Sequence, residues 1–130
     1  MIRELTEADV EFTITAEEEH IPIRGSFDSG DNAADEEMAK SIERDFNSGN
    51  EWAWCCVKVT GTWSPTEDVS LKADAYLGGC SYKSKRDFIE CNDYCKDMKA
   101  EVLDELNKKV KTCAEALECL KIPCVQGVAS

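Results

Sequence analysis

Alternation of apolar and polar residues near the start of the chain predicts a β-strand. Val10, Phe12 and Ile14 alternate with polar residues, and a period of two is that of a strand with one buried face. The following residues, 17–31, contain three consecutive glutamates, a proline and several turn-forming residues, and they indicate a loop. Three apolar positions in this loop are compatible with a short edge strand: Ile21, Ile23 and Phe27.

The next segment, residues 33–47, has the spacing of a helix. Met38, Ile42 and Phe46 recur every four residues. Acidic residues fill the first turn, where the helix N-terminus favours negative charge. We expect Asp31 or Asn32 to cap this helix and residues 48–50, Ser-Gly-Asn, to end it.

Residues 51–63, EWAWCCVKVTGTW, are rich in aromatic and β-branched residues and predict a strand. The odd-numbered positions from Ala53 to Trp63 form the expected core face, so Trp52 and Trp54 share the opposite face. Residues 64–66 would turn the chain, and the alternation in residues 69–77 predicts a hairpin partner that ends at a pair of glycines.

A long helical pattern covers the last third of the chain. Ser84 is expected to cap its start together with Asp87, three residues on. Apolar steps of three and four residues then hold for about nine turns, so we expect a long helix with a possible break near Asn107, ended by Pro123. The stripe reads Phe88, Cys91, Cys95, Met98, Val102, Leu106, Val110, Cys113, Leu117 and Leu120.

These elements predict an α+β fold with the order β-α-β-β-α. The chain has 130 residues, which suits a single domain over residues 1–130 with a loose C-terminal end from about residue 123. The simplest packing that buries the apolar faces of these elements is an antiparallel sheet of three to four strands. Both helices would then lie on the sheet face formed by Phe12, Val57 and Leu71.

Charge is distributed unevenly along this fold. The chain has a formal net charge of −12, and residues 1–51 carry fifteen acidic and four basic side chains, a net of −11. Such a chain repels nucleic acid, so we expect no direct nucleic-acid binding. No apolar run is long enough for a membrane span and the start lacks a basic, apolar leader, so we expect a cytoplasmic protein without membrane contact. The acidic half is either a solvated surface or a face for a basic partner.

Candidate catalytic chemistry is sparse. His20 is the only imidazole, and no motif of acyl transfer, zinc hydrolysis or nucleotide hydrolysis occurs. We therefore expect no enzyme activity and no cofactor. Cys91 and Cys95 are one helical turn apart and could hold a metal with Cys55 or Cys113, but their apolar surroundings favour core packing. We expect reduced, metal-free cysteines.

Trp52 and Trp54 allow two interpretations. We expect either the long C-terminal helix or the loop at residues 17–31 to cover these two side chains. If they are exposed instead, two neighbouring indoles on a partly polar face would anchor a protein partner.

Three stretches of the chain carry a resemblance to a known family. They are WAWCCV at residues 52–57, YLGGCSY at residues 76–82, and Asp87-Phe88 with the following helix that bears Tyr94, Asp97-Met98 and Leu106. Over residues 50–106 the chain resembles a family of small phage and prophage proteins. Acidic phage proteins of this size often counter host immunity, anti-CRISPR proteins included, and some imitate nucleic acid.

The resemblance implies an anti-CRISPR-like inhibitor of a host defence system, and the charge suggests how it would bind. Its acidic N-terminal half would occupy the basic surface of a nucleic-acid-binding host effector. The alternative is a non-enzymatic phage adaptor or structural protein that binds a protein partner through the aromatic strand face. The candidate partner-binding residues are Glu17, Glu18, Glu19, Asp28, Asp31, Asp35, Glu36, Glu37, Trp52 and Trp54.

Overall fold

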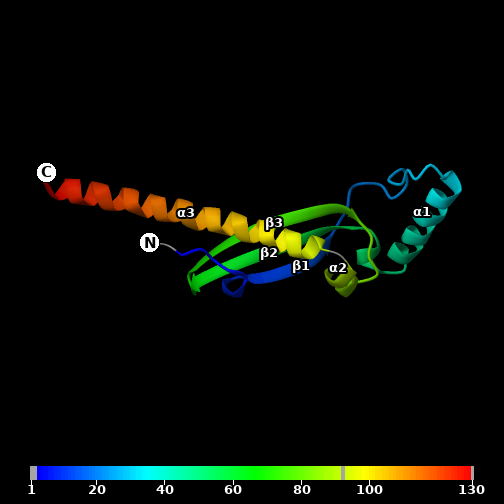
Figure 1. Cartoon of the computed structure of the whole chain (residues 1–130), viewed down its shortest axis with the longest axis horizontal. Coiled ribbons are helices and arrows are strands. Elements are labelled where there is room, and N and C mark those ends of the chain that lie inside the picture. The colour runs from blue at the N-terminus through cyan, green and yellow to red at the C-terminus, as the bar shows by residue number, and fades with distance from the viewer. Residues whose placement is uncertain (1–2, 92, 130) are drawn as a thin grey trace.

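The computed structural model describes residues 3–91 and 93–129, with side chains for residues 3–90 and 93–120. A three-stranded antiparallel sheet in the order β1-β2-β3 forms its centre. The strands are β1 (Glu11–Glu17), β2 (Cys55–Thr66) and β3 (Val69–Cys80). The helices are α1 (Asn32–Asn47), α2 (Lys85–Cys91) and α3 (Tyr94–Ala129), with 3-10 turns η1 (Glu7–Asp9) and η2 (Glu51–Ala53). The α+β prediction with a long C-terminal helix is confirmed (Figure 1).

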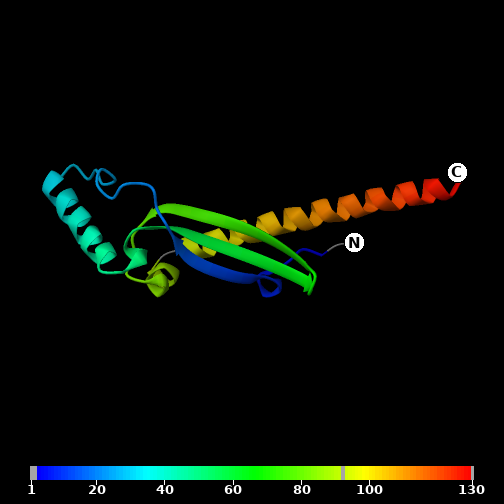
Figure 2. The ribbon, with the colours of Figure 1, turned by 180° about the vertical axis from the view of Figure 1, so that it is seen from behind.

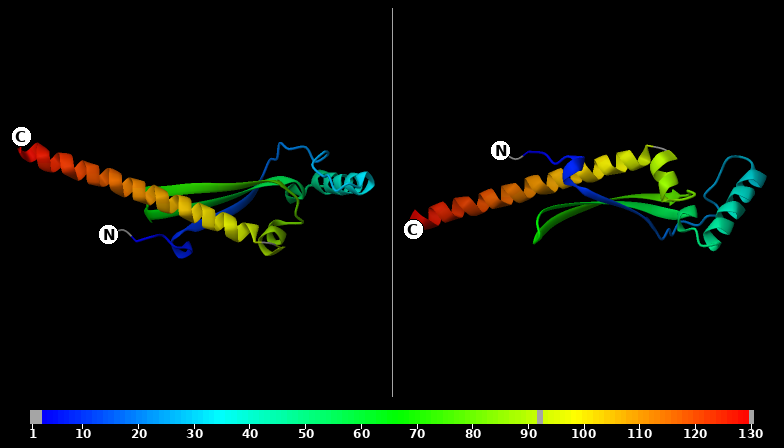
Figure 3. Two further views of the ribbon diagram at one scale, coloured as in Figure 1. Left: turned by 45° about the horizontal axis from the view of Figure 1, so that its top comes forward. Right: turned by 90° about the horizontal axis from the view of Figure 1, so that it is seen from below.

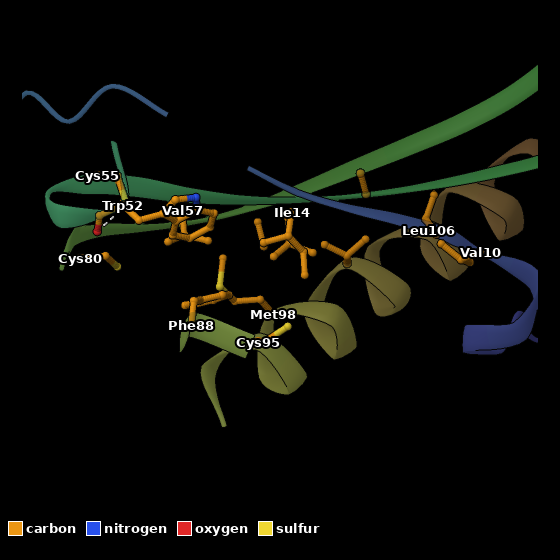
Figure 4. Close-up of a cluster of buried hydrophobic side chains, with 14 of the residues drawn as sticks. Val10, Ile14, Trp52, Cys55, Val57, Cys80, Phe88, Cys95, Met98 and Leu106 are labelled. Carbon is orange, nitrogen blue, oxygen red and sulfur yellow. Dashed lines mark hydrogen bonds between the residues drawn. The ribbon is translucent and has the colours of Figure 1, made fainter. Parts of the chain in front are cut away.

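The register of the sheet places the predicted apolar positions on one face. Ile14 lies opposite Val59, which lies opposite Ala75 on the far strand. Side chains on this face meet α3 and α2, and their core includes Phe88, Met98 and Leu106 (Figure 4). No helix of the described chain covers the other face, as the rear view shows with α3 behind the sheet (Figure 2). That face carries exposed threonines and charged residues, so it can remain in contact with solvent.

The position of α1 differs from the prediction. We expected both helices on one face of the sheet, but α1 lies beyond the end of the sheet and contacts η2 instead (Figure 1). Its start is as predicted, because the Asp31 side chain accepts hydrogen bonds from the amides of Ala33 and Ala34. Only Ala39 and Ile42 of α1 are buried. The apolar face of α1 is wide enough to pack against the short turn η2, but it is too narrow to cover the sheet.

The hairpin turns later than the sequence predicts. The strand β2 continues through Pro65, and the turn lies at residues 67–68. A register irregularity between Trp63 and Thr66 accommodates the proline, which has no amide hydrogen for the ladder. Pro65 also lies beyond Thr62, the last β2 residue that pairs with β1. The edge strand allowed for residues 21–27 does not form, so the sheet has three strands.

The C-terminal helical region breaks at a different place from the one expected. Ser84 Oγ accepts the amide of Asp87 at the start of α2, as the capping pattern predicts. The first helix ends at Cys91 and the second begins at Tyr94, whereas the helix is continuous at Asn107. The side chain of Asn107 bonds both the amide and the carbonyl of Leu5, which ties the N-terminal segment to α3.

The prediction that Pro123 ends the helix is also wrong, because α3 extends to Ala129. A proline removes one hydrogen bond and favours a kink, which a long helix can tolerate. No helix in the described residues combines the length and apolarity needed to cross a bilayer.

Candidate functional site

The acidic residues singled out in the sequence lie at one end of the molecule. We define the acidic lobe as residues 17–51, which comprise the end of β1, the loop 18–31, α1 and the start of η2. It carries eleven acidic and three basic residues, a net charge of −8. Figure 3 shows α1 and its loop beyond the sheet, at the opposite end from the C-terminus of α3. The structure therefore collects all eight candidate acids in one lobe.

Not all acids of the N-terminal half belong to this lobe. Glu4, Glu7, Asp9 and Glu11 lie before or at the start of β1, and Glu17 lies at its end. Seven residues of strand span roughly 20 Å, so these two groups of acids are well separated. Arg3 pairs with Asp9 at 2.8 Å and holds the pKa of this carboxyl well below its usual range. The acids that lie close together are therefore those of the lobe, and not those of the whole N-terminal half.

Glu19 fixes the loop of the lobe to the sheet. The register irregularity at the end of β3 includes Gly79, whose φ of 64° lies in the left-handed region that favours glycine. The amide of Gly79 donates to Glu19 Oε2 at 2.5 Å, and the amide of Ile21 donates to Glu19 Oε1 at 3.0 Å. These backbone donors lower the pKa of Glu19, so its negative charge persists further into acid than that of an ordinary glutamate.

Trp54 is a second point at which the loop of the lobe is attached to the rest of the protein. Its indole Nε1 donates to the carbonyl of Ile21 at 2.7 Å, and the Phe27 ring packs against it with centroids 6.2 Å apart. The loop 18–31 therefore covers Trp54, which is only 6% exposed. This is one of the two coverings that the sequence suggested.

Trp52 is covered by the other expected partner, the C-terminal helical region. Its ring stacks on Phe88 of α2 with centroids 6.0 Å apart, and it is 8% exposed. Trp52 lies in η2 and Trp54 follows it, so the prediction that both share one strand face is wrong: β2 begins only at Cys55. The amide of Trp52 donates to the Asn50 side chain, which starts the 3-10 turn. Neither indole can anchor a partner without opening the core.

Within the lobe, Arg24 holds the loop against α1. Its guanidinium contacts Glu36 at 2.5 Å and Glu43 at 2.8 Å, and it lowers the pKa of Glu36. Sequence analysis missed Glu43. Glu43 could have been found from the sequence, because it follows Glu36 by seven residues and so lies two turns along the same helix face. This triad neutralises part of the lobe and gives the loop a defined position.

The remaining candidate acids divide into two groups. Asp31 caps α1, and Asp35 accepts the hydroxyl of Ser29 at 2.7 Å, so both have structural partners. Glu17 lies 3.9 Å from Lys58. Three exposed acids have no structural task of this kind and are the natural contact residues of the lobe: Glu18, Asp28 and Glu37.

The cysteines divide between core and surface. Cys55, Cys80 and Cys95 are buried, and burial raises the pKa of Cys55 to about 12. Cys113 and Cys119 are exposed, against the expectation that the cysteines belong to the core. The side chains of Cys91 and Cys124 lie outside the described residues. Among the residues that are described, no group of three or more ligand-type side chains is placed to hold a metal ion.

Comparison of the chain with models of protein families, with curated proteins and with solved structures finds no match. The candidate site therefore depends on the chemistry of the lobe alone.

Proposed function

We propose that this protein is a non-enzymatic inhibitor of a bacterial defence system, of the kind that phages encode. Its acidic lobe would dock on the basic groove with which a defence effector holds nucleic acid. The observation that carries the proposal is the net charge of −8 on residues 17–51, gathered beyond one end of the sheet. A groove of lysines and arginines attracts such a lobe as it attracts phosphates.

Preorganisation of the carboxylates supports the proposal. Glu19, Asp31 and Asp35 accept hydrogen bonds from neutral donors, so the groups that fix their positions carry no opposite charge. Carboxylates that are already ordered lose little conformational entropy on binding. The lobe would therefore present some charges at fixed positions, beside the three exposed acids that have no such contacts.

The alternative adaptor function loses its proposed anchors. It required Trp52 and Trp54 on an accessible strand face, and both are buried. Residues of the open sheet face are mainly threonines and charged side chains, which are seldom the apolar anchors of an interface.

The test compares two triple variants that change net charge equally. The lobe variant E18K/D28K/E37K and the control variant E7K/E67K/E101K each raise the formal charge from −12 to −6. All six side chains are exposed, so both proteins should fold. Host proteins captured at low salt on the wild type and the control variant, but not on the lobe variant, should be nucleic-acid-binding effectors that duplex DNA or RNA displaces.

The corresponding cellular assay measures phage plaquing on a host with active CRISPR immunity. The wild type and the control variant should raise plaquing, and the lobe variant should not. If the two triple variants bind and protect equally, or if nucleic acid fails to displace the captured effector, the lobe is only a solvated surface and the proposal is wrong.

A further inference from the structure

Two cysteines lie opposite each other where the hairpin of β2 and β3 meets the acidic lobe. Cys55 is the first residue of β2 and Cys80 is the last residue of β3, and their Cα atoms are register partners. Directly opposed residues of an antiparallel pair have Cα atoms about 4.5–5.5 Å apart. A disulfide spans Cα distances of roughly 4.4–6.8 Å. The backbone therefore already holds these two cysteines at the distance that a disulfide needs.

A one-residue bulge in β3 creates this pairing. Val57 lies opposite Leu77, so regular pairing would place Gly79 opposite Cys55. The extra residue in β3 brings Cys80 to this position instead. Both side chains belong to the apolar core, where Cys55 is 1% and Cys80 6% exposed, and they lie at the same end of it (Figure 4). The bulge thus places two thiols at paired positions on one face of the sheet.

The two thiols are protonated in the resting protein. Burial raises the pKa of Cys55 to about 12, and burial also raises the pKa of Cys80. Each thiol makes a weak hydrogen bond to a backbone carbonyl, Cys55 Sγ to Trp52 at 3.9 Å and Cys80 Sγ to Leu77 at 3.2 Å. Because the thiolate is the reactive form, oxidation of this pair should be slow.

We propose that Cys55 and Cys80 form a redox-active pair, which a low-molecular-weight disulfide oxidises to a disulfide across the two strands. The thiolate of one cysteine attacks the oxidant and releases one small thiol, which leaves a mixed disulfide on the protein. The second cysteine attacks this mixed disulfide, forms the bond between Cys55 and Cys80, and releases a second small thiol. Two electrons and two protons thus pass from the protein to the oxidant.

This disulfide would close the hairpin at the point where the lobe is attached. Gly79, which precedes Cys80, donates its amide to Glu19 of the loop. Trp54, which precedes Cys55, donates its indole N–H to a carbonyl of the same loop. A covalent bond between the neighbouring residues restrains both donors, so oxidation should hold the lobe more firmly. The inference does not depend on the function proposed above, because thiol content and stability are its readouts.

Equilibration of the full chain for hours in glutathione buffers of varied ratio tests the pair. C113S, C119S and C124S remove the last three cysteines of the chain, so that they form no disulfides between molecules. After the reaction is quenched with acid and the free thiols are alkylated, the oxidised protein should have lost two thiols and carry no glutathione. Tryptic digestion should yield a disulfide that links residues 45–58 to residues 73–83.

C56A is the matched control. Cys56 is the neighbour of Cys55 in the sequence, but alternation along β2 places its side chain on the opposite sheet face. C56A should therefore keep the disulfide, whereas C55A and C80A should lose it. Oxidation should raise the Tm by roughly 5–15 °C, because the cross-link restricts the unfolded chain. It should also slow hydrogen exchange of the Gly79 amide.

Three results would overturn the proposal: a protein that keeps all its thiols at the most oxidising ratio, a mixed disulfide with glutathione that persists, and a link through Cys56. The tryptic link does not require C55A or C80A to fold, so it remains decisive if either variant is unstable. A disulfide that forms without a change in exchange at Gly79 overturns the effect on the lobe.

Discussion

Gly61 marks the closest approach of α3 to the sheet, and a methyl group there should destabilise the protein. A Cβ built at Gly61 would lie 2.5 Å from Val102 Cγ1, 3.0 Å from Val10 Cγ1 and 3.3 Å from Leu106 Cδ1. All three neighbours are buried, and Val102 and Leu106 are fully so. A flexible side-chain end could move aside, but these branched groups are held on several sides. G61A must therefore shift α3 away from β2.

The size of the effect follows from two opposing terms. Overpacking a well-packed core costs about 1–3 kcal/mol. Replacing a strand glycine by alanine returns about 0.5–1 kcal/mol, because the unfolded chain loses freedom. We expect a net loss of about 1–2 kcal/mol. V102A alone should also destabilise, because it removes two buried methyl carbons and leaves a cavity.

Urea denaturation of the four members of this double-mutant cycle checks the reasoning. In G61A/V102A the new methyl occupies space that Val102 vacates, so the double variant should be more stable than the sum of the single losses by about 1 kcal/mol or more. T13A, on the open sheet face, should change stability by less than about 0.5 kcal/mol. If G61A is as stable as the wild type, or if the two losses add, α3 does not lie this close to Gly61.

Two shorter predictions concern the lobe and the thiols. E19Q should loosen the lobe and cost about 1 kcal/mol in urea denaturation. Because the pKa of Glu19 is lower in the folded state, the wild-type advantage over E19Q should be full at neutral pH and disappear as pH falls through this lowered value; an advantage that persists in acid would contradict the bonds to Gly79 and Ile21. In native protein, Cys113 and Cys119 should react with a thiol reagent within minutes; fast labelling of the remaining described thiols would contradict their burial or partial burial, and these are Cys55, Cys56, Cys80 and Cys95.

Local periodicity was a reliable guide wherever the sheet supplied the burial. The alternation of Phe12 and Ile14 in β1, and of Val57 and Val59 in β2, predicted the core face because each strand has one wet side. The same reasoning failed for Trp52 and Trp54. Aromatic composition favours a strand, but the side chain of Asn50 starts a 3-10 turn there. A single capping residue outweighed the propensity of the segment.

The candidate acids were found by composition, and of their structural roles only the capping of α1 by Asp31 was predictable. Whether a carboxylate is free or engaged depends on contacts between distant residues, such as Glu19 with Gly79. Likewise, the stripe of α3 continues through Leu117 without any change in sequence where the sheet ends. Periodicity indicates that a helix face is apolar and gives no information on what covers it.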